Sequence, residues 1–352
     1  MERQKFIRRF LTITAIAISI GLLILFDSIL DSYMMRIINL CGIYITLALS
    51  LNLIYGFTGL FSLGHAGFMA VGAYTTALLT MSPAQKQMNF FLEPIVPWLA
   101  NVEWSFFPAL MMGGLVAAVT GFLIGAPALK LKDDYLAIAT LGFAEIIRIF
   151  FTNMQSVTNG PLGLKGLPPY TNMWWTWGIA FISILFMIYL FRGSYGRAFK
   201  AIREDEVAAE AMGINLFRHK MLSFTIGSFM AGVGGGLLGN LMGTIDPLMF
   251  RFLLAFNILL IVVLGGMGSI TGTVISAIVI TILMEYLRFL DGPMDLILFK
   301  TDGIPGLRMV IFSIMLMVVI LFFQKGIMGN REFSWDFLFK PGRLKKNNVE
   351  GE

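Results

Sequence analysis

The sequence predicts an all-α polytopic integral membrane protein with about ten transmembrane helices. Hydrophobic residues make up 57% of the 352 residues and charged residues only 13%, against about 25% charged residues in soluble domains. The apolar residues form runs of about 20, which is the length that crosses a bilayer as a helix. The basic residues concentrate on alternate connections between these runs. This composition excludes a disordered chain, and the lone Cys41 excludes a disulfide scaffold.

Ten apolar runs, read between charged residues and turn formers, are the expected spans. The first continues for about 18 residues before Asp27, whereas the apolar core of a signal peptide has about 7–15 residues. We therefore expect an uncleaved first span and not a signal peptide. The fifth run carries two charges, and the eighth is short. The spans are expected at residues 11–30, 35–54, 64–82, 106–129, 135–152, 173–191, 222–243, 252–266, 270–290 and 308–325.

The distribution of basic residues predicts the orientation of these spans. With the N-terminus inside, 18 of the 26 Lys and Arg residues lie on the inner side, seven lie outside, and Arg148 lies within a span. Cytoplasmic segments carry this excess, so both termini are expected in the cytoplasm, with the chain in the cell (inner) membrane. We expect a transmembrane domain over residues 1–330, with a cytoplasmic loop at 192–220, and a cytoplasmic tail over 331–352. The net charge of +5 therefore reflects membrane topology, and no nucleic-acid partner is expected.

Catalytic and metal-binding patterns are missing from the sequence. It has no G-x-x-x-x-G-K-[ST] run and hence no loop that cradles the phosphates of ATP. Its two histidines, His65 and His219, and its single cysteine provide no set of metal ligands. We therefore expect neither an enzyme nor a bound metal or cofactor. The chain either moves a solute with energy supplied by another protein, or it forms a channel.

Two charged residues, Glu145 and Arg148, lie in the middle of the fifth expected span. They are three positions apart, so on a helix they share a face and can form an ion pair. Charged residues inside a membrane usually face the protein interior or a water-filled cavity. Two interpretations are open: a neutralised structural pair, or a polar patch that lines a transport pathway.

Two glycine-rich segments, residues 56–72 and 265–272, lie at the cytoplasmic ends of expected spans. Small residues allow helices to pack closely in lipid, but glycines also mark places where a helix unwinds to line a pathway. For His65, a packed position at a helix end is favoured over a ligand-binding role. A third glycine run, residues 232–239, predicts close packing of the seventh span against a neighbour, for which a second permease subunit is one candidate. The candidates for a pathway are Gly59, Ser62, Gly64, His65, Gly266 and Ser269, together with Glu145 and Arg148.

The cytoplasmic loop at 192–220 is expected to contain two short helices. Gly196 is expected to begin the first, Asp205 to cap the N-terminus of the second, and Gly213 to end it in a left-handed conformation. Such a short amphipathic helix rests on lipid headgroups or in a groove of a partner protein. Its acidic first turn suits the helix dipole but is repelled by anionic lipid, which favours the protein partner. The acidic residues are Glu204, Asp205 and Glu206, and the apolar residues that follow at helical spacing are Val207, Ala208, Ala211 and Met212.

This loop resembles the coupling region of ABC importer permeases, the EAA-x-x-x-G segment that docks on the ATPase subunit. Gly213 matches the motif glycine and Ala208 and Ala209 match its two alanines, but Val207 stands at the position of the glutamate. The Leu-Pro ending of the general motif is absent as well. With these departures, the loop resembles the LivM-type branch of the branched-chain amino acid permeases. The resemblance of the chain to this branch runs from about residue 33 to 330. The segments that carry the resemblance are Tyr195–Arg203, Met212–Asn215, Asn52–Phe68, Asp134–Arg148 and Thr158–Pro161.

The resemblance implies an ABC importer permease subunit for branched-chain amino acids. It also implies a homologous permease subunit as partner in a heterodimer, two ABC ATPase subunits that hold the ATP, and a substrate-binding protein outside. Alternatives from other classes remain open: a urea, amide or other amino acid permease, a stand-alone secondary transporter or channel, and a non-transporting membrane scaffold. The residues expected to couple to the ATPase are Glu204, Asp205, Glu206, Ala208, Ala209 and Gly213.

Overall fold

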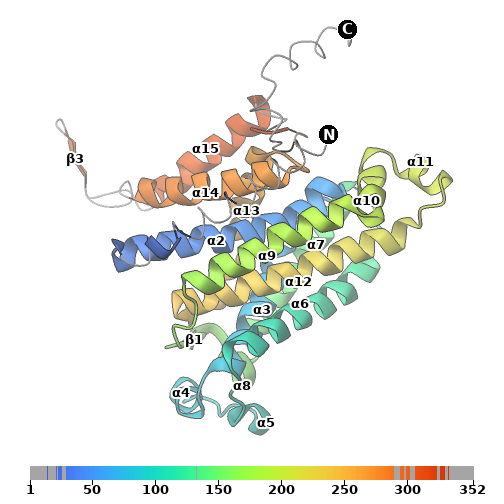
Figure 1. Ribbon diagram of the computed structural model, residues 1–352. Helices are drawn as coiled ribbons and strands as arrows, with labels where there is room; N and C mark the ends of the chain where they lie inside the picture. Colours follow the sequence, from blue (N-terminus) through green and yellow to red (C-terminus); the bar gives the residue numbers. More distant parts are fainter. Residues whose placement is uncertain are drawn as a thin grey trace.

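The apolar runs of the sequence fold into helices that lie side by side in one bundle (Figure 1). The computed structural model describes residues 14, 21, 23–25, 29–131, 133–288, 294–296, 299–301, 306–322, 326–329 and 332. The long helices are α2 (Ser32–Asn52), α6 (Phe106–Ala128), α7 (Asp133–Asn153), α9 (Met173–Arg192) and α12 (Leu216–Met242). The shorter apolar helices are α3 (His65–Thr80), α13 (Phe252–Gly265), α14 (Ile270–Tyr286) and α15 (Leu307–Phe322).

Most of the expected spans correspond to helices. Five are confirmed as long and apolar enough to cross a membrane: Ser32–Phe57, Phe106–Ala128, Tyr135–Asn153, Met173–Arg192 and Leu216–Met242. Four more correspond to α3, α13, α14 and α15, which have only 14 to 17 residues each. The first expected span, 11–30, and the expected tail, 331–352, lie largely outside the described residues. The total of ten spans therefore stays a prediction.

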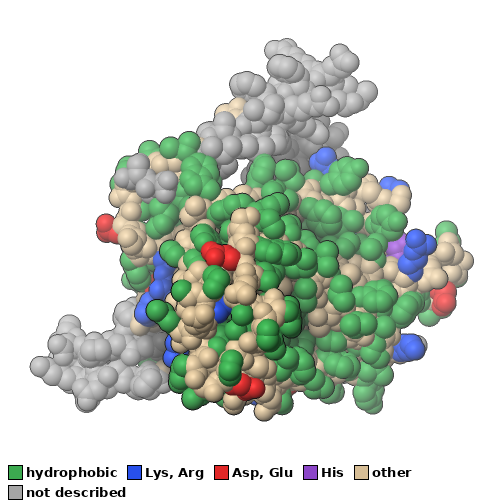
Figure 2. Space-filling model, turned by 90° about the horizontal axis from the view of Figure 1, so that it is seen from below, with side chains coloured by type: hydrophobic (Ala, Val, Ile, Leu, Met, Phe, Trp, Pro, Cys, Tyr) green, Lys and Arg blue, Asp and Glu red, His purple; other side chains and the backbone are tan. Residues whose placement is uncertain are grey.

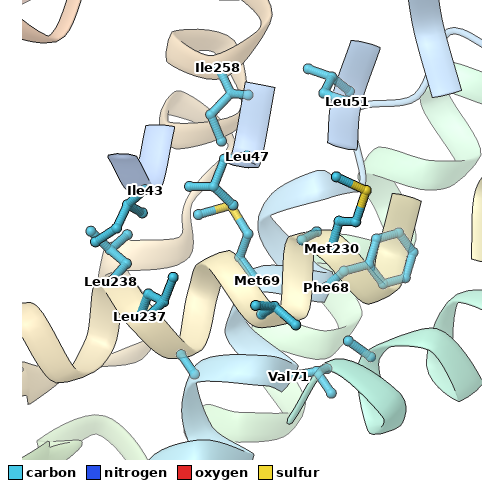
Figure 3. Close-up of a cluster of buried hydrophobic side chains, with 14 of the residues drawn as sticks. Ile43, Leu47, Leu51, Phe68, Met69, Val71, Met230, Leu237, Leu238 and Ile258 are labelled. Atoms are coloured by element: carbon cyan, nitrogen blue, oxygen red, sulfur yellow. The ribbon is translucent and has the colours of Figure 1, made fainter. Parts of the chain in front are cut away.

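Helices α2 and α12 form the centre of the bundle. In their most apolar stretches 83% and 78% of the residues are buried, against 22% in α7 and 28% in α9. Helix α12 packs against α3 and α6, and its glycines let the backbones touch: a Cβ at Gly235 would lie 2.1 Å from the Met69 carbonyl oxygen. The predicted close packing of this run is confirmed; the neighbours are α3 and α6 of the same chain and not a second permease subunit. Apolar side chains from α2, α3, α12 and α13 fill the core between these helices (Figure 3).

Helices α7 and α9 turn apolar faces away from the bundle. Ile138 and Ile146 on α7 are exposed, as are Ile182 and Tyr189 on α9. Figure 2 shows hydrophobic side chains over a large part of the surface seen from below. Because monomeric soluble proteins rarely expose large contiguous apolar patches, these faces are suited to contact with lipid or with another membrane subunit. The fold is that of a multi-pass membrane protein.

The two longest polar connections, which the sequence places on opposite sides of the membrane, lie at opposite ends of the bundle (Figure 1). Helices α10 (Ser194–Glu204) and α11 (Glu206–Ala211) extend from one end. The connections at the other end hold α4 (Pro83–Asn89), α5 (Pro97–Ala100), α8 (Gln155–Thr158) and the 3-10 turns Gly160–Leu162 and Pro247–Phe250. There β1 (Leu164–Lys165) pairs antiparallel with β2 (Thr244–Ile245). A second antiparallel pair, β3 (Met294–Leu296) with β4 (Phe299–Thr301), follows α14.

Lys86 fastens the connection between α3 and α6. Its Nζ donates hydrogen bonds to the carbonyl oxygens of Leu99, at 2.9 Å, and Val102, at 2.5 Å. The side chain is fully buried, and this burial lowers the pKa of the Lys86 ammonium. The capping box of Ser82 and Gln85 starts the helix that presents the lysine. This end of the bundle is thus a folded structure and not a loose loop.

Candidate functional site

The first glycine segment, residues 56–72, covers the connection between α2 and α3 and the first half of α3. Helix α2 continues into a π-helical turn, Leu53–Phe57, and α3 begins only at His65. Between them Gly59 adopts a left-handed conformation, with φ of +79°. Ser62 is buried, and Gly64 precedes the first residue of α3. Non-helical backbone at membrane depth is tolerated only where it is buried in protein or lines a cavity. The segment therefore combines a buried non-helical connection with the packed α3, and its role in a pathway stays a prediction.

The second glycine segment, residues 265–272, is a tight turn between α13 and α14. Gly266 and Gly268 have φ of +108° and +84°, values that favour glycine strongly. Ser269 caps α14, because its Oγ accepts a hydrogen bond from the Gly272 N–H at 3.0 Å. Beyond the sequence-based expectations, Glu332 also reaches this helix end and accepts hydrogen bonds from the Ile270 N–H, at 2.6 Å, and the Thr271 N–H, at 3.1 Å.

Asn52, the last residue of α2, holds the two glycine segments together. Its Oδ1 accepts a hydrogen bond from the Gly268 N–H at 3.0 Å. Its Nδ2 donates to the Ser269 carbonyl oxygen at 3.0 Å and to Thr273 Oγ1 at 2.6 Å. The side chain is fully buried. Segments more than 200 positions apart in the sequence therefore share one polar junction inside an apolar bundle.

Arg203 brings the α10–α11 pair into contact with the same junction. Its NH1 donates a hydrogen bond to the Gly56 carbonyl oxygen at 2.8 Å. A Cβ at Gly268 would lie 2.5 Å from this nitrogen, and a Cβ at Gly59 would lie 3.1 Å from Arg203 Cγ. From the sequence, Arg203 was expected to be one of the basic residues of the cytoplasmic loop and the end of the Tyr195–Arg203 segment, with no inward contact. Its position before an acidic run gave no signal of an inward contact.

His65 is packed inside the bundle. Its Nε2 lies 2.8 Å from the Oγ of Ser50 on α2, and the residue is almost completely buried. A hydrogen bond of this kind suits the packed position that was favoured for this residue. A pathway role for His65, Ser62 or the glycines stays a prediction.

Glu145 and Arg148 form the ion pair that their spacing predicts. Arg148 Nε donates to Glu145 Oε1 at 2.9 Å, and NH2 contacts the same oxygen. The side chain of Glu145 is 46% exposed and that of Arg148 is 21% exposed, on a helix that is mostly apolar. A charged pair on such a half-exposed face in a membrane calls for water or another protein beside it.

The loop at 192–220 contains two short helices, as predicted, and the ends of α11 agree with the sequence. Asp205 caps α11, because its Oδ1 accepts hydrogen bonds from the N–H groups of Val207, at 2.8 Å, and Ala208, at 3.0 Å. Gly213 is left-handed, with φ of +83°. The prediction for Gly196 is wrong: α10 begins at Ser194, and Gly196 lies within it.

The apolar residues of α11 do not rest on the bundle. Val207 and Met212 are among the most exposed hydrophobic residues, and Ala208 and Ala211 are exposed as well. Ala209 is the buried residue of this helix. The predicted apolar stripe therefore faces away from the chain. Beside it, a groove of about 640 Å³ between α10 and α11 is lined largely by apolar atoms.

A bundle of apolar helices, in which two glycine-rich connections meet a helix pair at one end, indicates a membrane permease subunit. Residues 33–321 match the family described as branched-chain amino acid transport system / permease component. The chain belongs to this family.

Known relatives agree with this assignment. The chain is 35% identical to the high-affinity branched-chain amino acid transport system permease protein LivM of Escherichia coli, over 72% of this chain and 63% of the relative. It is 25% identical to the probable branched-chain amino acid transport permease protein LivM of Methanocaldococcus jannaschii, over 70% of this chain and 80% of the relative. It is 26% identical to the high-affinity branched-chain amino acid transport system permease protein LivH of E. coli, over 70% of this chain and 82% of the relative. The match thus spans less than two thirds of E. coli LivM. No solved structure matches the chain.

Proposed function

We propose that the chain is a permease subunit of an ATP-driven ABC importer for branched-chain amino acids, located in the cell (inner) membrane with both termini in the cytoplasm. The observation that carries the proposal is the exposed apolar face of α11, where Val207 and Met212 are 78% and 82% exposed. An exposed apolar face rimmed by polar residues marks a binding surface. The neighbouring Glu204 and Glu206 oppose anionic lipid as the partner. A transport subunit without an ATP site requires an ATPase there.

The α10–α11 pair is built to transmit force. Asp205 and Gly213 fix the two ends of α11, and Ala209 packs toward the chain while Ala208 faces outward. The carboxylate of Glu206 pairs with Lys220 on α12, with 2.5 Å between Oε1 and Nζ. These contacts support the coupling role of Glu204, Asp205, Glu206, Ala208, Ala209 and Gly213: a partner that moves α11 also moves the helices behind it.

The proposed partners supply the functions that this transport subunit lacks. Two ABC ATPase subunits hold and hydrolyse ATP, and this chain carries no cofactor. A homologous permease subunit completes the pathway as a heterodimer, which is supported by the similarity of the chain to both LivM and LivH of E. coli. A substrate-binding protein delivers the amino acid at the end that carries α4 and α5.

The pathway is proposed to run beside the glycine segments and the polar face of α7. Both glycine segments contain left-handed backbone next to buried polar groups, an arrangement typical of discontinuous transporter helices. The proposed pathway residues on them are Gly59, Ser62, Gly64, His65, Gly266 and Ser269. Glu145 and Arg148 belong to the same proposal because their half-exposed side chains need a polar neighbour.

The docking surface is tested by placing a charge in its centre. In the complete transporter, Met212→Glu is expected to weaken ATPase association at least about tenfold, because a buried methionine side chain contributes about 1.5–3 kcal/mol. Gly213→Asp is expected to act in the same direction, because φ of +83° disfavours a side chain. Met88→Glu is the matched control, since Met88 is 78% exposed at the opposite end. ATPase retention on Met212→Glu comparable to that on Met88→Glu would refute the docking surface.

The substrate and the competing classes need separate measurements. We expect the cognate outside protein to bind labelled leucine in preference to urea; the reverse preference would assign the permease to amides. Uptake by the purified chain alone under an ion gradient would instead establish a secondary transporter or channel. Loss of partner attachment without loss of uptake, on deletion of the chain, would establish a scaffold.

A further inference from the structure

Among the residues that the structure describes, Arg203 is the side chain of α10 that donates a hydrogen bond into the glycine junction. Its NH1 nitrogen serves both segments: it donates to the Gly56 carbonyl oxygen at 2.8 Å and fills the space beside Gly268. The Arg203 backbone also approaches Gly59, where a Cβ would lie 3.3 Å from Arg203 Cα. A side chain on Gly59 or Gly268 would crowd the arginine. The glycines therefore form its binding cradle.

The arginine connects this cradle with the exposed end of α10. Glu204 Oε1 accepts hydrogen bonds from Arg203 Nε, at 3.1 Å, and NH2, at 2.5 Å. The side chain of Glu204 is 70% exposed, whereas that of Arg203 is 21% exposed. The polar contacts thus continue from the exposed end of α10 to the Gly56 carbonyl. This carbonyl belongs to the last turn of a helix, where carbonyl groups have no N–H donor within the helix. Arginine suits both contacts because its five donors are held in a rigid fork.

We infer that Arg203 is a positioning residue that carries the displacement of α10 to both glycine segments at once. This inference rests on the proposed ATP-driven transport, in which the ATPase moves the α10–α11 pair. Because Asn52 bonds the end of α2 to Gly268 and Ser269, a displacement of Gly56 also moves the second segment. Without the arginine, α10 still follows the ATPase and keeps the contact of Lys200 with the Phe57 ring, but the hydrogen bond from α10 to the glycine segments is lost.

The test compares ATP hydrolysis with transport in the same vesicles. The complete transporter, with its ATPase subunits and binding protein, is reconstituted in liposomes and supplied with labelled leucine. Arg203→Ala is expected to retain ATPase association and hydrolysis, while the leucine taken up per ATP falls at least about tenfold. Arg203→Lys, which keeps the charge and one reaching donor, is expected to recover part of this ratio. Arg192→Ala, an exposed arginine at the end of α9, is the matched control and leaves the ratio unchanged.

Each result decides the role of Arg203. A lowered ratio with intact ATPase association and partial rescue by lysine supports it, because a merely structural residue would lower assembly and not the ratio. An unchanged ratio in Arg203→Ala overturns it. A joint loss of assembly and uptake that Arg203→Lys does not relieve overturns it as well. If the wild-type complex neither hydrolyses ATP nor takes up leucine, the proposed function itself fails and the inference falls with it.

Discussion

Replacing Asn52 by leucine removes three hydrogen bonds while keeping nearly the same branched shape. The amide oxygen accepts from the Gly268 N–H, and the amide nitrogen donates to the Ser269 carbonyl and to Thr273 Oγ1, all between 2.6 and 3.0 Å. Side-chain hydrogen bonds between membrane helices contribute about 0.6 kcal/mol on average and up to about 1.7 kcal/mol. Three such bonds give about 2–5 kcal/mol. The Gly268 N–H, which has a left-handed turn around it, is left without this acceptor in the core.

The matched control is Asn240→Leu. Asn240 is also buried, but its Nδ2 donates only to the Gly236 carbonyl of its own helix, at 3.0 Å. Its Oδ1 has no hydrogen-bond partner among the residues that the structure describes. Because an intrahelical bond to a carbonyl adds little to a helix that is already formed, we expect a loss of at most about 1 kcal/mol, or a small gain.

The measurement is the unfolding of the purified chain titrated with a denaturing detergent, after reconstitution in lipid. Asn52→Leu is expected to lower the free energy of unfolding by about 2–5 kcal/mol relative to wild type, and Asn240→Leu by much less. The outcome that contradicts the reasoning is an equal effect of the two substitutions. In that event, burial of an amide in the bundle, and not the junction between the glycine segments, determines the loss.

Two further predictions concern charged residues. Glu145→Gln leaves the Arg148 guanidinium without its ion pair within the membrane, and we expect uptake to fall about tenfold. The double substitution Glu145→Arg with Arg148→Glu is expected to restore the amount of folded protein but not uptake. Full recovery of uptake in the double variant would show that the pair is structural. Lys86→Met removes the donor to Leu99 and Val102 and is expected to destabilise the chain by about 1–3 kcal/mol in thermal unfolding. Because burial lowers the pKa of Lys86 below its ordinary value of 10.5, the folded chain binds fewer protons than the unfolded chain between the two pKa values. Wild-type stability should therefore rise with pH up to about that ordinary value and level off above it. The same rise in Lys86→Met would contradict this cause.

The positions of the long helices were predictable because apolar runs determine them, but their ends were not. The seventh span was expected at 222–243, whereas α12 begins at Leu216. Asn215 caps this helix by accepting a hydrogen bond from the Arg218 N–H at 2.9 Å. The helix therefore begins before Arg218 and Lys220, in a polar region that hydropathy does not assign to a span. Local hydrogen bonding decides a helix end, and hydropathy decides only which part lies in lipid.

In the candidate site, too, features set by local hydrogen bonds were predictable, whereas contacts between distant segments were not. The cap by Asp205 and the left-handed Gly213 depend on neighbours in sequence, and both were predicted and confirmed. The contacts of Asn52 with Ser269 and of Arg203 with Gly56 join positions 217 and 147 residues apart. No local pattern distinguishes Arg203 from other basic residues of the same membrane side. Only the folded chain shows that its guanidinium reaches inward.

The two interpretations of the glycine segments, close packing and helix interruption, describe one arrangement. A Cβ at Gly56 would lie 1.7 Å from Asn52 Oδ1 and 2.5 Å from the Gly268 nitrogen, so the absent side chain is what allows Asn52 to reach the second segment. The left-handed φ of Gly268 in turn directs its N–H at that oxygen. Close approach therefore creates the polar junction, and the junction stabilises the interrupted helices inside an apolar bundle. The same glycines can accordingly serve both the observed close packing and the proposed transport pathway.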